Sequence, residues 1–128
     1  MPVRSLNSPV FKWPDRGAVD RAVREWASRL VQERRDVAAV GYFGSYARGD
    51  WGVGSDVDLI VILTTSPLPF ERRAASLDAS LAVTGSVATA FPVPVDLLVY
   101  TWEEWQLVAQ QPARRRIGRE AVWVYGHT

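Results

Sequence analysis

Cysteine is absent from this sequence, and histidine occurs once, at the penultimate position His127. The missing cysteine excludes disulfides, thiolate catalysis and cysteine-bound zinc or iron–sulfur centres, and it is typical of a protein that works in the reducing cytoplasm. A single terminal histidine also argues against histidine-based catalytic triads and multi-histidine metal sites. Any chemistry of this chain is therefore expected to rest on carboxylates.

Long apolar runs and an excess of one charge are missing as well. The longest aliphatic run, Leu59–Leu63, is too short to cross a bilayer, and residues 1–16 lack the apolar stretch of a secretory signal, so we expect no membrane partner. The 15 Lys and Arg residues against 14 Asp and Glu give a formal net charge of +1, which creates no overall field for nucleic acid. A nucleic-acid partner then depends on local features such as Arg114–Arg116, a run more typical of a solvated helix end.

Helices are indicated by apolar periodicity and by capping residues. Apolar positions from Val19 onward predict a first helix, for which Asp15 is a suitable N-cap. The segment Phe70–Leu81 follows two prolines and predicts a second helix, with Arg73 on its polar face. Thr101, with a glutamate three residues later, forms a capping box that predicts a third, short helix.

Strand-like segments alternate with these helices, which indicates an α+β fold. The predicted strands are Val37–Phe43, Asp56–Leu63, Val95–Tyr100 and Ala121–Tyr125, the last at a sheet edge. At 128 residues the chain has the usual size of one domain. We expect a single two-layer domain over 1–128, with a mixed sheet of about four strands, a core at about 19–100 and a C-terminal helix and edge strand at 101–126.

Three aspartates are the candidate catalytic and metal-binding residues. Asp56 and Asp58 are separated by one residue, so in a strand both point to the same face, about 6.5 to 7 Å apart. Paired carboxylates of this kind suit Mg²⁺ or Mn²⁺, although two solvated acids at a strand start are an open alternative. Asp96 supplies a third acid on another strand, and if buried it needs a partner such as this metal site or a neighbouring backbone group.

Gly44 and Ser45 stand where a strand ends and a short helix begins. A glycine there lets the backbone approach a phosphate closely, and the following amides with the Ser45 hydroxyl form an anion cradle. The alternative is an ordinary strand-to-helix turn with a serine cap. Together, the cradle and the three acids describe a phosphate held against metal ions.

The spacing of these residues resembles a known family. Gly44–Ser45, ten further residues, Asp56-Val57-Asp58 and a later strand with Asp96 are similar to the nucleotidyltransferase superfamily related to DNA polymerase beta. Ser45–Gly49 also resembles the usual continuation of the family motif. The likeness covers about Val19–Val99 and is strongest to the minimal nucleotidyltransferases, whose core makes up nearly the whole chain.

The resemblance implies a role for each motif residue. Ser45 and the amides after Gly44 hold the β- and γ-phosphates of a nucleoside triphosphate, with ATP expected for the family. Asp56 and Asp58 bind two Mg²⁺ ions, and Asp96 completes the second ion and accepts the proton of the acceptor hydroxyl. The hydroxyl then attacks the α-phosphorus and pyrophosphate leaves.

Several residues allow two interpretations. Arg48 either contacts phosphate or is a solvated surface residue. Trp51 either stacks on a base or a partner or packs onto its own domain. Trp102, Trp105 and Trp123 are expected to be core or edge cover, unless they lie exposed together as a patch for a partner.

The resemblance also implies a partner. Minimal nucleotidyltransferases are associated with helical HEPN proteins, and some act as antitoxins that transfer AMP to a tyrosine of that ribonuclease toxin. Few elements follow Tyr100, so the acceptor site is expected from a HEPN-family partner or from a homodimer. Two alternatives stay open: a non-catalytic module that neutralises a toxin by binding, and a nucleotidyltransferase acting on RNA or a small molecule.

Overall fold

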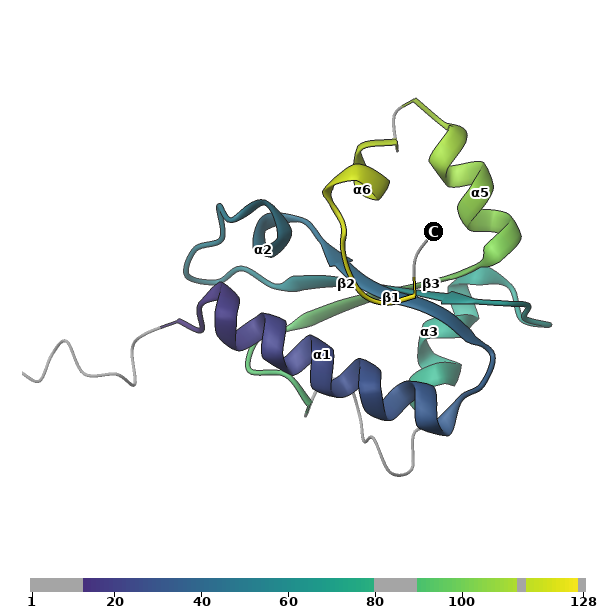
Figure 1. Cartoon of the computed structure of the whole chain (residues 1–128), viewed down its shortest axis with the longest axis horizontal. Coiled ribbons are helices and arrows are strands. Elements are labelled where there is room, and N and C mark those ends of the chain that lie inside the picture. Colours follow the sequence, from purple (N-terminus) through teal and green to yellow (C-terminus); the bar gives the residue numbers. More distant parts are fainter. Residues whose placement is uncertain (1–12, 80–89, 113–114, 127–128) are drawn as a thin grey trace, which may run out of the picture.

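The computed structural model describes residues 13–79, 90–112 and 115–126. In chain order the elements are α1 (Arg16–Glu33), β1 (Val37–Phe43), α2 (Ser45–Arg48), β2 (Val57–Leu63), α3 (Phe70–Ala79), β3 (Val95–Thr101), α5 (Trp102–Gln110), α6 (Arg115–Glu120) and β4 (Val122–Tyr125) (Figure 1).

The described strands form one sheet in the order β3-β2-β1-β4. β1 pairs antiparallel with β2 and β4, whereas β2 and β3 run parallel. The mixed sheet and the edge position of the last strand are therefore confirmed. Every residue of β2 except Asp58 is buried, as expected for an apolar strand covered on both faces.

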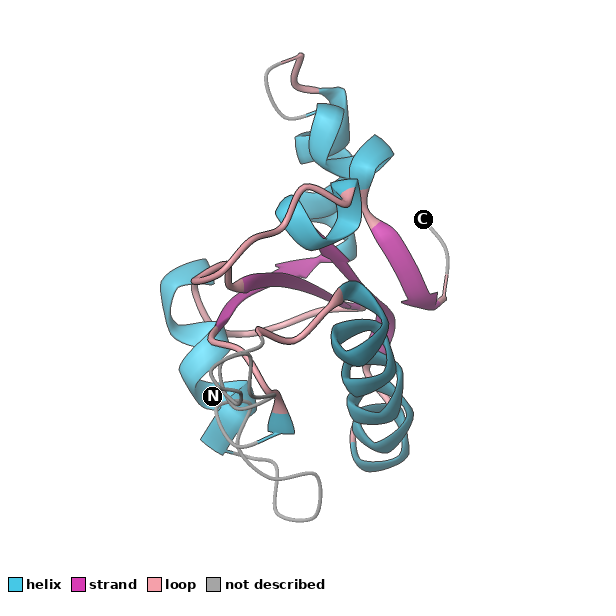
Figure 2. Cartoon of the chain, turned by 90° about the vertical axis from the view of Figure 1, so that its left-hand side faces the viewer, coloured by secondary structure: helices cyan, strands magenta, loops and turns pink. Residues whose placement is uncertain are grey.

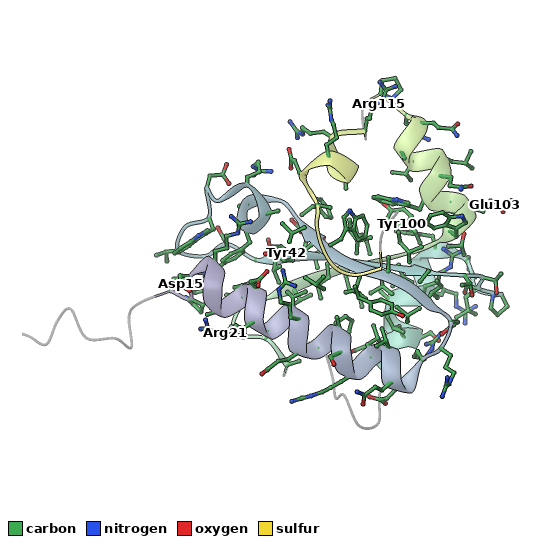
Figure 3. The ribbon with its side chains drawn as sticks, in the orientation of Figure 1. Asp15, Arg21, Tyr42, Tyr100, Glu103 and Arg115 are labelled. Atoms are coloured by element: carbon green, nitrogen blue, oxygen red, sulfur yellow. The ribbon has the colours of Figure 1, made fainter. Side chains whose placement is uncertain are left out.

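Helices lie on both faces of this sheet (Figures 1 and 2). On one face Val23, Trp26 and Leu30 of α1 pack into a large apolar cluster, and Tyr42 of β1 reaches α1 with its hydroxyl 2.7 Å from Asp20 Oδ1 (Figure 3). On the other face α5 contributes Trp105 and Val108 to a smaller cluster, and α6 packs against it through Ile117. The predicted α+β fold is confirmed, and α5 with α6 adds a short helical cover to the second face.

The predicted capping residues act as caps. Asp15 accepts a hydrogen bond of 2.9 Å from the Ala18 amide at the start of α1. Thr101 and Glu104 form both bonds of the capping box at the start of α5, with distances of 3.2 Å and 3.0 Å. These local signals fix where the two helices begin.

Some boundaries differ from the prediction. β2 begins at Val57 because its pairing with β3 starts there and the Val57 amide donates to the Pro94 carbonyl at 2.9 Å, so Asp56 precedes the strand. β4 begins at Val122, since the Ala121 amide still closes α6. The sequence did not predict α6, and three positions used in the prediction, Leu81, Arg114 and His127, lie outside the described residues.

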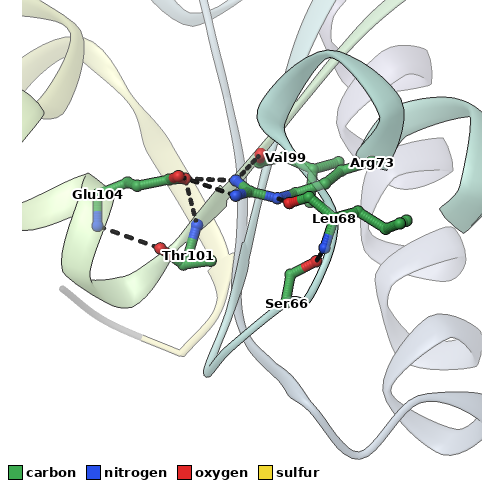
Figure 4. Close-up of polar contacts among 6 residues, drawn as sticks. All are labelled: Ser66, Leu68, Arg73, Val99, Thr101 and Glu104. Carbon is green, nitrogen blue, oxygen red and sulfur yellow. Dashed lines mark hydrogen bonds and ion pairs between the residues drawn. The ribbon is translucent and has the colours of Figure 1, made fainter.

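Arg73 is buried, so its predicted place on a polar helix face is wrong. Its side chain is 6% exposed and donates to the carbonyls of Leu68 at 2.8 Å and Val99 at 3.3 Å (Figure 4). It also forms a two-bond ion pair with Glu104, whose second bond measures 2.8 Å. Four acceptor contacts replace the water that a buried guanidinium loses.

The C-terminal tryptophans do not form one exposed patch. Trp105 is buried, and its ring lies 5.5 Å from those of Tyr100 and Trp123. Trp102 is 38% exposed. The expected covering role is confirmed for Trp105 and Trp123 and wrong for Trp102. Among the described residues, the helices are too short or too polar to cross a membrane.

Candidate active site

Gly44 forms the turn between β1 and α2. Its φ of +86° is a left-handed conformation that glycine adopts easily, and a Cβ atom built there would overlap Asp58 Oδ2. The backbone of this turn therefore lies directly against a carboxylate of the neighbouring strand. Gly44 itself occupies the N-cap position without a side-chain hydrogen bond, so the alternative of Ser45 as an ordinary helix cap is wrong.

The sheet brings the second and third acids together. Asp58 and Asp96 are direct partners in the parallel pairing of β2 with β3, so their side chains share one face. Alternation along β2 turns Leu59 toward the cluster that contains α1 and leaves Asp58 and Ile60 on the face covered by α5 and α6. Asp56, two residues before Asp58, completes an acidic group.

The acids differ in exposure and in electrostatics. Asp58 is half-buried, whereas Asp56 and Asp96 are exposed. Burial raises the pKa of Asp58, and the negative charges of Asp56 and Asp96 raise it further, to about 6, although Arg48 acts in the opposite direction. Asp96 lies on an edge strand and is exposed, so it does not need a partner to offset the free energy of burying a charge.

A divalent cation fits this donor set. The negative charges of Asp56 and Asp96 act on Asp58, so a cation placed among the three carboxylates would stabilise the ionised form of Asp58. Among the described residues, no group of three or more Asp, Glu, His or Cys side chains is placed as a metal-binding cluster. Magnesium does not require one, since it usually takes one or two carboxylates together with waters and substrate phosphates.

A cavity of about 400 Å³ adjoins the Gly44 turn. Its wall contains four predicted residues, Gly44, Ser45, Arg48 and Asp58, together with residues of α6. The complete lining is Phe43, Gly44, Ser45, Arg48, Asp58, Arg116, Ile117 and Glu120. A larger cavity of about 630 Å³ between α3 and β3 contains none of the predicted site residues.

Arg48 is an exposed residue of the cavity wall, and its contact with phosphate stays a prediction. It lines the cavity, and it also forms ion pairs with Asp50 at 3.1 Å and Glu120 at 3.3 Å. Trp51 packs onto its own domain, because its ring stacks on Tyr46 with a centroid distance of 5.6 Å and an interplanar angle of 7°.

Three wall residues from α6, Arg116, Ile117 and Glu120, were not predicted as site residues. The only sequence signal was the arginine run that contains Arg116, and a run of charges alone does not indicate a cavity.

The fold places the Gly44 turn beside the acidic group of a mixed sheet. The nucleotidyltransferase domain family matches residues 23–118, most of the chain. The chain belongs to this family, as the resemblance of its motifs predicted.

Solved structures share the fold. A candidate nucleotidyltransferase from Sulfolobus solfataricus aligns with a TM-score of 0.57 and 17% identity over 84% of this chain and 80% of its own. A toxin–antitoxin structure with AMP-PNP aligns with a TM-score of 0.54 and 17% identity over 82% and 74%. A mutant of the toxin–antitoxin MntA–HpeT, in which two aspartates separated by one residue are changed to glutamate, aligns with a TM-score of 0.52. Its sequence identity is 14%, over 82% of this chain and 74% of its own. A comparison with curated proteins finds no match.

Proposed function

We propose that this chain is a magnesium-dependent nucleotidyltransferase that moves AMP from ATP to an acceptor hydroxyl. The acceptor we propose is a tyrosine of a HEPN-family toxin, so that the chain acts as the antitoxin. One observation carries the proposal: the Gly44 turn lies directly against Asp58, and Asp58 faces Asp96 across a parallel strand pair. This arrangement lets a triphosphate and carboxylate-bound cations meet at one point.

Each residue has a defined part in the proposed reaction. Ser45 and the amides after Gly44 bind the β- and γ-phosphates. Asp56, Asp58 and Asp96 hold two Mg²⁺ or Mn²⁺ ions, which when bound neutralise the triphosphate and favour the ionised acceptor hydroxyl. Asp96, which is exposed, accepts the hydroxyl proton. The acceptor oxygen forms a bond to the α-phosphorus while the bond from that phosphorus to pyrophosphate breaks.

Two of the structural neighbours support the proposed substrate and partner. One was solved with AMP-PNP, an ATP analogue, and both are toxin–antitoxin structures. The two aspartates changed in the second have the spacing of Asp56 and Asp58 in this chain. We further propose that residues 1–128 act as one domain in the cytoplasm, with the acceptor supplied by the partner.

Labelled nucleotides test the proposal. The protein is incubated with Mg²⁺, host lysate and α-phosphate-labelled ATP, GTP, CTP or UTP, and label is followed into protein, RNA and small molecules. Asp58→Asn is expected to lower transfer at least about a hundredfold, because it removes a cation ligand. Glu103→Gln, which changes an exposed carboxylate on α5, is the matched control and is expected to keep full activity. Full transfer by Asp58→Asn would end the proposal.

A non-catalytic antitoxin is the second candidate, favoured by the lack of a complete metal cage among the described residues. In that case Asp56→Ala, Asp58→Ala and Asp96→Ala combined in one protein would still protect cells from the toxin. We expect protection to be lost. Label found in RNA or a small molecule would instead keep the transferase and replace its acceptor.

A further inference from the structure

Helix α6 is held at a fixed place beside the Gly44 turn. It leads directly into β4, which pairs with β1 at Gly41 and Tyr42. A Cβ atom built on Gly41 would lie 2.8 Å from Trp123 Cε3, so the two strands pack closely there. Since β1 continues into Gly44, the strand that positions the turn also positions α6.

Glu120, on the last turn of α6, joins two arginines of the cavity wall. Its Oε1 lies 3.3 Å from Arg48 Nη1, and its Oε2 lies 3.1 Å from Arg116 Nε. The Glu120 side chain is 19% exposed, whereas those of Arg48 and Arg116 are 41% and 75% exposed. Single contacts made by exposed arginines are weak, so both arginines can exchange this carboxylate for another anion.

A triphosphate is a stronger acceptor than Glu120 for these groups. It carries more negative charge and more oxygens, and a guanidinium binds phosphate through paired N–H donors. All three side chains line the cavity that also contains Ser45 and Asp58.

We infer that Arg116 binds the triphosphate of the nucleotide, and that Glu120 holds Arg116 and Arg48 until the nucleotide enters. The inference rests on the proposed function, because it concerns the same nucleotide site. It adds to the proposed site an arginine of α6 that binds phosphate, and a glutamate of the same helix that competes with phosphate for that arginine.

The same helix provides matched controls. Arg115, seen at the outer end of α6 in Figure 3, and Arg119 line a different cavity, beside Trp105 and Trp123. Arg119→Gln therefore removes the same charge from the same helix without changing the nucleotide cavity.

Binding of Mg²⁺·ATP, measured by calorimetry at one salt concentration, tests the inference. Arg116→Gln is expected to weaken binding about tenfold and Arg119→Gln less than about twofold, since only Arg116 reaches phosphate. AMP, which lacks the β- and γ-phosphates, is expected to bind both variants alike. Equal losses of ATP affinity for the two variants would overturn the role of Arg116.

Glu120→Gln tests whether the Glu120 carboxylate competes with the triphosphate for the two arginines. It is expected to tighten ATP binding about threefold, and the gain is expected to shrink when Arg116→Gln is also present. Strict additivity of the two changes would overturn the role of Glu120. Thermal melting confirms that each variant is folded. If the wild type transfers nucleotide but neither Arg116→Gln nor Glu120→Gln changes ATP affinity as expected, the inference fails and the proposed function stands. If the wild type binds no nucleotide, both fail.

Discussion

Two clusters of arginine and glutamate in this protein use the same chemistry in different surroundings. Arg73 is 6% exposed, pairs with Glu104 through two bonds and donates to two backbone carbonyls (Figure 4). Arg116 is 75% exposed and contacts Glu120 through its Nε, while Glu120 also contacts Arg48. The first cluster ties α3 and β3 to α5, and the second borders the candidate nucleotide cavity.

The difference shows what makes an ion pair structural. A buried guanidinium with several fixed acceptors cannot leave them without exposing unpaired charge in the interior, so removal of one partner is costly. An exposed pair loses little when separated, because water replaces each contact. The second cluster can therefore release its arginines to a ligand while the first holds the framework.

Arg73→Met is expected to give the largest effect. It leaves Glu104 without its cation and removes the hydrogen bonds that Arg73 donates to two backbone carbonyls, so the free energy of unfolding should fall by about 3 to 5 kcal/mol. Arg116→Met is the matched control and should change it by less than about 0.5 kcal/mol. Urea unfolding measures both, and equal midpoints for the two variants would remove the distinction.

Glu104 gives the first cluster a pH dependence. Hydrogen bonds from Arg73 hold the pKa of Glu104 at about 2, below its usual 4.5. A lowered pKa contributes stability that is complete above pH 4.5 and is lost as the pH falls toward 2. Because the side chain is 37% exposed, we expect about 2 kcal/mol. Urea midpoints from pH 6 to 2 should fall more for the wild type than for Glu104→Gln, and parallel curves would contradict this.

Separation along the chain distinguishes the features that the sequence predicts from those that it does not. The spacing of Asp56, Asp58 and the Gly44 turn is local, and so is the capping box of Thr101, so the sequence could relate these residues to one another. Asp96 lies far along the chain from Asp58 and was singled out by its strand context and by the family resemblance. Arg73 was misplaced because its acceptors Val99 and Glu104 lie 26 and 31 residues away, and only packing brings them together.

The α6 wall of the candidate nucleotide cavity was missed for a similar reason. Glu120 reaches Arg48 only because β4 pairs with β1, a contact between segments 72 residues apart. Helix periodicity and local motifs carry no information about such a meeting.

Asp58 is the opposite of Glu104, because burial and the charges of two neighbouring acids raise its pKa. Its pKa of about 6 lies above its usual 3.8, so the ionised form opposes folding at neutral pH and the penalty disappears as the pH falls from 6 to below 3.8. Asp58→Asn should stabilise the metal-free protein by about 1 kcal/mol at pH 7 and not at pH 3.5. Thermal melting at both pH values checks this. Added Mg²⁺ should raise the melting temperature of the wild type more than that of the variant, and equal shifts would count against the metal site.

The smallest expected effect belongs to Glu120. Its pairs with Arg48 and Arg116 are single contacts to exposed arginines, so Glu120→Gln should change the free energy of unfolding by less than about 0.5 kcal/mol. A small effect on stability together with a change in ATP affinity would separate ligand control from structural support in this cluster. A loss above about 1 kcal/mol in urea unfolding would show instead that Glu120 fastens α6 to α2, as Glu104 fastens α5 to α3. The two glutamates would then share one role, although their partners Arg73 and Arg116 differ in exposure.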